Sequence, residues 1–144
     1  MASHDSWFIW ALLSAVFAAL TAILAKVGLE GIDADFATLV RCVVILGCLA
    51  GFVVATGKWT NPASLQPKTL IFLVLSGLAT GISWVCYFRA LKVGDASQVA
   101  PVDKFSLVLV AIFAVIFLGE RPSVKDWGGI ALVAAGVLAL AWKR

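Results

Sequence analysis

The chain has 144 residues, of which 62% are hydrophobic and only 13% are charged, and its formal net charge is +3. A soluble domain carries about a quarter charged residues, so this chain has too few polar groups to cover a water-facing surface, while its apolar content excludes a disordered chain. The basic residues are scattered singly, which argues against a nucleic-acid partner. The composition therefore predicts an integral membrane protein embedded in a lipid bilayer.

Five apolar runs follow one another along the chain, and each is long enough to cross the hydrocarbon core, which takes about 20 residues. The predicted helices cover residues about 7–27, 36–56, 69–91, 97–118 and 124–142. Runs of this length without alternation favour helices over barrel strands. The segment before the first run carries no Lys or Arg, so we expect a retained helix and not a signal peptide.

The connecting segments carry turn and capping residues. Gly119 is expected to stop the fourth helix, and Ser123 with Asp126 is expected to form a capping box for the fifth. Asp95 or Ser97 is expected to cap the fourth helix. No linker is long enough to separate domains, so the sequence predicts an all-α fold in which residues 1–144 form one bundle of five transmembrane helices.

Small residues mark places where helices could approach closely. The second run contains Gly47 and Gly51, and the third contains Gly77 and Gly81, each pair in a G-x-x-x-G pattern. In lipid such patterns favour close backbone packing. Packing within the chain is the simpler interpretation, and a dimer interface is the alternative.

Nothing in the sequence suggests covalent chemistry. The three cysteines, Cys42, Cys48 and Cys86, lie inside apolar runs without the spacing of metal ligands, and the single histidine is His4 in the N-terminal tail. There is no elbow motif and no phosphate-binding loop. We therefore expect no enzyme activity, no cofactor and no metal site.

The adjacent charges Asp103 and Lys104 are the most unusual feature of the fourth run. Asp103 is expected about 12 Å beyond Asp95, well inside the membrane, where a short carboxylate must face a polar cavity or a partner. Neighbouring helical positions point about 100° apart, so the two charges are not expected to neutralise each other, whereas Ser106 shares the face of Asp103. With Pro101 interrupting the helix, this segment predicts a binding site. The alternatives are that Asp103 lies nearer the membrane interface, or that it forms a purely structural pair with Lys104 or with Arg41.

Other polar residues in the spans have two interpretations each. Arg41, in the second span, could bind an anionic group or pair with Asp103, or could simply reach toward the interface. In the third span Ser83, Trp84 and Tyr87 could line a substrate pocket or could pack in the core. We include Asp103, Trp84, Tyr87, Ser83, Ser106, Arg41 and Lys104 as candidate substrate-binding residues.

The charges near the ends of spans have simpler interpretations. Lys26 lies four residues before Glu30, which is the spacing of a surface ion pair along a helix. Arg89 and Lys92, at the end of the third span, are expected to act as topology charges.

Several short motifs resemble those of a known family: Ala90-Leu91-Lys92-x-Gly94, Ala96-Ser97-x-x-Ala100-Pro101, Leu118-Gly119-Glu120 and Trp127-x-Gly129 followed by Gly136-Val137. Over nearly its whole length the chain resembles a single EamA domain of the drug/metabolite transporter superfamily. The resemblance implies transport of small metabolites or drugs through a central cavity by alternating access. Members usually carry two such five-helix repeats in opposite orientations, and this chain has one.

A single repeat would find its inverted partner most simply in a second, antiparallel copy. Four basic residues lie on the side of the N-terminus and five on the other side, and this weak bias permits dual topology: Lys58, Lys68, Arg121 and Lys125 against Lys26, Arg89, Lys92, Lys143 and Arg144. We therefore expect a homodimer, antiparallel, in the inner or plasma membrane. A parallel dimer or a heteromer with a related unit stays open.

The competing functional class is a membrane scaffold or assembly subunit that transports nothing. Asp103 discriminates between the two classes. In a transporter it should be essential for substrate-dependent flux yet dispensable for folding, whereas in a scaffold it should act only through stability.

Overall fold

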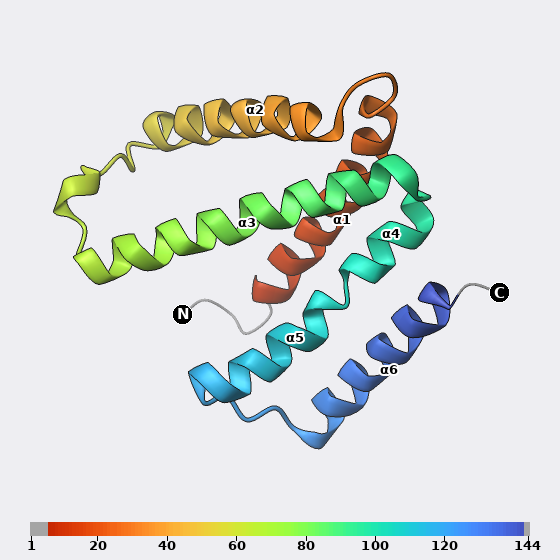
Figure 1. Ribbon diagram of the computed structural model, residues 1–144. Helices are drawn as coiled ribbons and strands as arrows, with labels where there is room; N and C mark the ends of the chain where they lie inside the picture. The colour runs from red at the N-terminus through yellow and green to blue at the C-terminus, as the bar shows by residue number, and fades with distance from the viewer. Residues whose placement is uncertain (1–5, 143–144) are drawn as a thin grey trace. The chain divides into compact units, whose positions relative to one another are not determined.

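The computed structural model describes residues 6–142, which are helical almost throughout (Figure 1). In chain order the elements are α1 (Ser6–Gly28), α2 (Ala34–Ala55), the 3₁₀ turn η1 (Pro62–Ser64), α3 (Pro67–Val93), α4 (Ala96–Asp103), α5 (Ser106–Phe113), the π-helical turn η2 (Ala114–Leu118) and α6 (Val124–Ala141). No strand occurs among residues 6–142. Five segments are long and apolar enough to cross a membrane: Trp7–Gly28, Ala34–Ala55, Pro67–Val93, Ala96–Leu118 and Val124–Ala141. The predicted all-α membrane fold with five spans is confirmed.

Large apolar side chains are exposed along every span. Leu78 is 61% exposed, Phe117 77% and Leu132 77%. In water such surfaces would drive aggregation, whereas acyl chains solvate them at no cost. The exposure therefore fits helices surrounded by lipid.

The chain divides into two compact units. A central unit contains residues 24–93, and a flanking unit contains residues up to 23 and from 94 onward. Each unit has its own internal packing.

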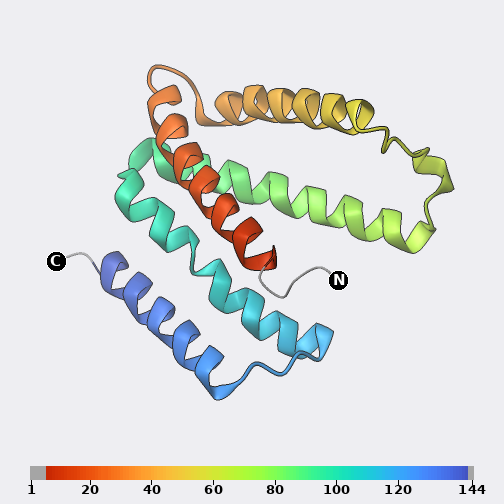
Figure 2. The same cartoon turned by 180° about the vertical axis from the view of Figure 1, so that it is seen from behind.

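In the central unit α2 packs against α3. The two helices lie closest near the α1–α2 loop and separate toward η1, as Figures 1 and 2 both show. The buried side chains gather at the close end, with Leu91 fully buried and Phe88 2% exposed. Leu29, Ala34 and Thr38 complete this small core. Packing thus holds the pair together at one end.

Local hydrogen bonds explain why α2 begins where it does. The Asp33 carboxylate accepts bonds from the backbone N–H groups of Asp35, at 2.9 Å, and Phe36, at 3.1 Å, which satisfies two of the free donors at the helix start. Buried Thr38 donates its hydroxyl to the Ala34 carbonyl at 2.8 Å. The helix therefore enters the core with its polar groups paired.

The G-x-x-x-G patterns do not form helix contacts within the central unit. A Cβ atom built at Gly47, Gly51, Gly77 or Gly81 would meet no neighbouring atom within 4 Å. α2 and α3 therefore do not pack on each other through these glycines, and packing elsewhere in the chain or at a dimer interface stays a prediction. The reason is the geometry of the pair, because α2 and α3 are in contact at the opposite end.

In the flanking unit α4 and α5 both pack against α6. The capping box at the start of α6 is confirmed: Ser123 Oγ accepts the Asp126 N–H at 3.3 Å, and Asp126 Oδ2 accepts the Ser123 N–H at 2.8 Å. The stop at Gly119 is also confirmed, since this residue has φ of 68°. That left-handed conformation favours glycine and ends the widened turn η2.

The fourth span is not one continuous helix. Lys104 donates its N–H to Pro101 O and Phe105 to Val102 O, both at 3.0 Å, so the bonds close over three residues instead of four. Lys104 has ψ of −5° and Phe105 ψ of −23°, which are 3₁₀ values. The span therefore consists of α4, a tight turn, α5 and η2.

Candidate functional site

Arg41 lies about 10 Å along α2 from its first residue, inside a membrane span. Its Cζ atom is 4.6 Å from the ring centroid of Trp84 and 5.2 Å from that of Phe88, both on α3. The side chain is half-buried. The two helices thus hold a guanidinium against two aromatic rings, one turn beyond the buried core.

The other cations at this end of the central unit all have oxygen partners. Lys26 and Lys92 bind main-chain carbonyls, and Arg89 binds a carboxylate. Arg41 differs from these cations. In the described part of the unit it contacts two aromatic rings, and no oxygen there accepts a hydrogen bond from it. Its N–H donors are available to a group from outside the unit.

The structure brings together part of the predicted aromatic set. Trp84 and Tyr87 are half-buried, and the Tyr87 ring meets that of Phe88 edge-on at 6.3 Å, whereas Ser83 is exposed. Phe88 is the member that the sequence interpretation missed. The signal was available, because Phe88 follows Trp84 by four residues and so lies on the same face of α3.

Two lysines cap each other's helices. Lys26, in the last turn of α1, donates from Nζ to the Leu91 carbonyl at 2.7 Å. Lys92, in the last turn of α3, donates to the Leu29 carbonyl at 2.7 Å and to that of Ile32 at 2.5 Å. A lysine near a helix C-terminus satisfies carbonyls that have no intrahelical donor. Here each lysine does so for the neighbouring helix, and together they fasten α1, the following loop and α3.

Two of these cations make contacts that the sequence did not predict. The Lys26 ammonium, predicted to pair with Glu30 along its own helix, reaches the end of α3. Arg89, interpreted as a topology charge, also forms a two-point ion pair with Asp35, with Nε at 2.8 Å from Oδ1 and Nη2 at 2.5 Å from Oδ2. Both contacts join residues that lie far apart in the sequence.

In the flanking unit Asp103 Oδ2 lies 3.5 Å from Lys104 Nζ. The expectation that the two charges would not neutralise each other is therefore wrong. Adjacent positions point apart in a 3₁₀ turn as they do in an α-helix, so the contact depends on the long, flexible Lys104 side chain folding back toward its neighbour. Their side chains remain exposed, by 36% for Asp103 and 52% for Lys104, so the pair is long and open.

Ser106 is exposed and is the first residue of α5, just after the turn. Residues three apart share a face in a 3₁₀ turn as well, so the shared face of Asp103 and Ser106 stays a prediction. Pro101 does not explain the turn, because the N–H that a proline lacks would bond toward Ser97, in the opposite direction along the chain.

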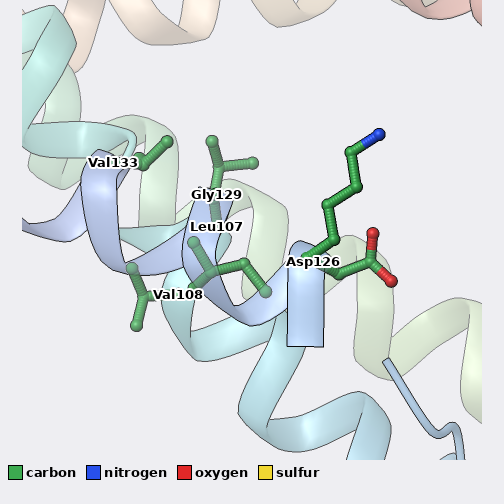
Figure 3. A pocket seen from close by; sticks show the side chains of 7 residues that line it. Leu107, Val108, Asp126, Gly129 and Val133 are labelled. Atoms are coloured by element: carbon green, nitrogen blue, oxygen red, sulfur yellow. The ribbon is translucent and has the colours of Figure 1, made fainter. Parts of the chain in front are cut away.

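An open groove of about 390 Å³ runs between α5 and α6 in the flanking unit. Leu107 and Val108 line one side, and Gly129 and Val133 lie on the other, with Asp126 near one end (Figure 3). The lining is apolar apart from Lys125 and Asp126. A groove of this character fits acyl chains better than a polar metabolite.

The sequence model of the EamA-like transporter family matches residues 5–142. The chain belongs to the EamA-like transporter family. Membership makes it a membrane transporter protein by descent, and its relatives are transporters and not enzymes.

Two proteins with similar sequences show what this EamA-like transporter is related to. One, from Sinorhizobium sp, bears the name "Uncharacterized transporter in cobO 3' region" and is 60% identical over 137 residues, or 95% of this chain and 97% of the relative. Another, from Yersinia pestis (strain Pestoides F), is a probable 4-amino-4-deoxy-L-arabinose-phosphoundecaprenol flippase subunit, ArnE, 28% identical over 85 residues, or 58% of this chain and 75% of the relative. No solved structure matches the chain significantly.

Proposed function

We propose that this EamA-like protein moves a small metabolite or drug across the inner or plasma membrane by alternating access, and that it works as a dimer. In the central unit the proposed substrate-contacting residues are Arg41, Ser83, Trp84 and Tyr87, with Phe88 added. In the flanking unit they are Asp103, Lys104 and Ser106. The five helices together are proposed to form one repeat of the transporter.

The observation that carries this proposal is Arg41. A guanidinium inside a membrane span is costly, and such residues usually mark a substrate or ion pathway. The contacts with Trp84 and Phe88 offset part of that cost, yet they leave the hydrogen-bond donors unused. A purely structural arginine would be expected to have an oxygen partner, as Arg89 does with Asp35.

Asp103 is the second polar element of the proposed path. Its contact with Lys104 is long, at 3.5 Å, and both side chains remain exposed. A weak and accessible pair can exchange its partner for a substrate group or a proton more readily than a short buried one. We therefore propose that Asp103 takes part in coupling.

Support for a dimer comes from the size of the relatives and from their names. The Sinorhizobium transporter is covered over 97% of its own length by a match of 137 residues, so a protein of similar size is named a transporter. The name of ArnE contains the word subunit, which fits an assembly of more than one chain. An antiparallel pair with dual topology would supply the inverted repeats that a midplane site needs.

Proteoliposomes test the function without a known substrate. Vesicles containing the purified chain are incubated with a mixture of metabolites, and their contents are compared by mass spectrometry with those of empty vesicles. We expect accumulation of at least one compound, and its loss in Arg41→Gln vesicles. The control is Lys68→Gln, which removes a cation from the start of α3, far along the helix from Trp84. If no compound accumulates, a scaffold or assembly subunit becomes the better interpretation.

A further inference from the structure

We propose that the Arg41 guanidinium binds an oxyanion, a phosphate or carboxylate group, on its in-plane N–H edge while Trp84 and Phe88 support its face. This inference rests on the proposed function and names the chemical class of ligand for its site. It concerns a group within α2 and α3 only, so all of its residues lie in one unit.

The geometry of the stack determines which atoms are open. A guanidinium has its five N–H donors in one plane, and a ring over its face contacts none of them. Arg41 Cζ lies 4.6 Å from the Trp84 centroid and 5.2 Å from the Phe88 centroid. Both distances are measured to Cζ, and no oxygen in the described part of the unit accepts a hydrogen bond from Arg41, so its N–H donors remain for a ligand with two oxygens side by side.

The surrounding charges favour an anion. Lys26, Arg89 and Lys92 lie near the same end of the α2–α3 pair. Asp35, a carboxylate of this cluster, is already bound to Arg89 through both oxygens. With Arg41 these cations carry four positive charges against the three negative charges of Glu30, Asp33 and Asp35, so a cation ligand would still meet net positive charge. An oxyanion would give Arg41 the oxygen partner that it lacks in the described part of the unit.

The test measures binding to the full chain in detergent by tryptophan fluorescence and by calorimetry. The probes are n-butyl phosphate, n-butyrate and n-butanol, which share an alkyl tail and differ in charge. We expect saturable binding of at least one of the two anions and none of the alcohol. A wild-type protein that binds neither anion, or that binds butanol equally well, overturns the oxyanion site.

Matched variants assign the site. Arg41→Gln should abolish saturable binding, and Arg41→Lys, which keeps the charge without the planar fork, should weaken it about tenfold. Lys68→Gln should change the affinity less than about twofold, because a distant surface charge is screened. Trp84→Phe should remove the fluorescence change while calorimetry still detects binding. Unchanged affinity in both Arg41 variants, with normal helicity by circular dichroism, overturns the assignment.

Asp103→Asn tests whether the Asp103 carboxylate already accepts hydrogen bonds from the Arg41 guanidinium. We expect Asp103→Asn not to raise the affinity for the anions, because the ligand and not this carboxylate is proposed to occupy Arg41. A gain of about tenfold or more would identify Asp103 as the acceptor and would overturn the proposal.

The anion could come from a free metabolite or from a lipid headgroup, and nanodiscs distinguish these sources. If phosphatidic acid added to phosphatidylcholine nanodiscs weakens butyl phosphate binding, the headgroup competes for Arg41; if it does not, the site takes soluble anions. Either result supports an oxyanion site and assigns its source. Metabolite flux without anion binding would overturn this inference alone, and anion binding at Arg41 without flux would overturn only the transport proposal.

Discussion

Lys26 Nζ donates a 2.7 Å hydrogen bond to the main-chain oxygen of Leu91, a residue 65 positions later in the chain. Lys92, next to Leu91, returns the interaction to Leu29 at the end of α1. Each lysine thus satisfies a carbonyl at the end of the other helix, and one of these carbonyls belongs to Leu91, which is fully buried.

Removal of one of these caps should be measurable. We expect Lys26→Met to lower the free energy of unfolding by about 1–2 kcal/mol, because the methionine keeps the apolar stem but leaves the Leu91 carbonyl without its charged donor. Unfolding by sodium dodecyl sulfate followed by circular dichroism gives this value. The matched control is Lys68→Met, which should be near neutral. Equal stabilities for the two variants would contradict a role for the cap.

Leu91 itself provides a test of packing. Leu91→Ala should destabilise the protein by about 1–3 kcal/mol, less than in a soluble core, because lipid solvates apolar groups and the cavity term dominates. Leu78→Ala, on the same helix but at a side chain that is 61% exposed, is the control and should have little effect. The same unfolding assay compares the two, and an equal loss would show that the burial of Leu91 carries no packing energy.

The capping box predicts a local effect at α6. Ser123→Ala should cost about 1 kcal/mol, because the Asp126 N–H loses its acceptor, and Ser123→Asp should retain most of the stability. Ser97→Ala, in the first turn of α4, is the control, since Asp95 and not Ser97 lies at the N-cap position there. A stable Ser123→Ala protein would contradict this account of how α6 begins.

Asp103 should matter for flux and not for folding. We expect Asp103→Asn to reduce metabolite uptake by proteoliposomes about tenfold or more and to remove the dependence of uptake on pH, with helicity unchanged. Glu120→Gln, another carboxylate of the flanking unit, is the control. Transport that persists unchanged in Asp103→Asn across the pH range would end the proposal of proton coupling through this residue.

Orientation can be tested in intact cells. In a background without Cys42, Cys48 and Cys86, single cysteines at each terminus are labelled with a membrane-impermeant reagent before and after permeabilisation. Dual topology predicts that each terminus is labelled in part from each side. If each terminus is labelled from one side only, and the two termini from opposite sides, the chain has a single orientation. That result would exclude an antiparallel homodimer formed by dual insertion.

Much of the fold could be predicted, because a bilayer constrains helix length strongly. The run from about residue 69 to 91 predicts α3, observed as Pro67–Val93, and the Ser123–Asp126 spacing predicts the start of α6. The tight turn at Lys104 could not be predicted from helix length or capping residues. Its hydropathy is that of an ordinary span, and a change from four-residue to three-residue hydrogen bonds leaves no mark in composition.

The candidate site shows the same division. Arg41 and Trp84 could be selected separately, because a cation or an indole inside a span requires an explanation. Their stacking depends on the register between α2 and α3, which no local pattern encodes. The hydrogen bonds of Lys26 to the Leu91 carbonyl and of Lys92 to the Leu29 carbonyl were missed for the same reason. Each joins residues far apart in the sequence through a backbone oxygen.

The end at which α2 and α3 pack together, near Leu91, can also act as a pivot for α3. α3 has 27 residues and so extends about 40 Å from its fastened end. A rotation of only about 5° near Leu91 would displace the far tip by about 3.5 Å, by simple leverage over that length. Arg41 and Trp84 lie close to this end, so a small rotation caused by binding of the proposed oxyanion would give its largest displacement at the far tip.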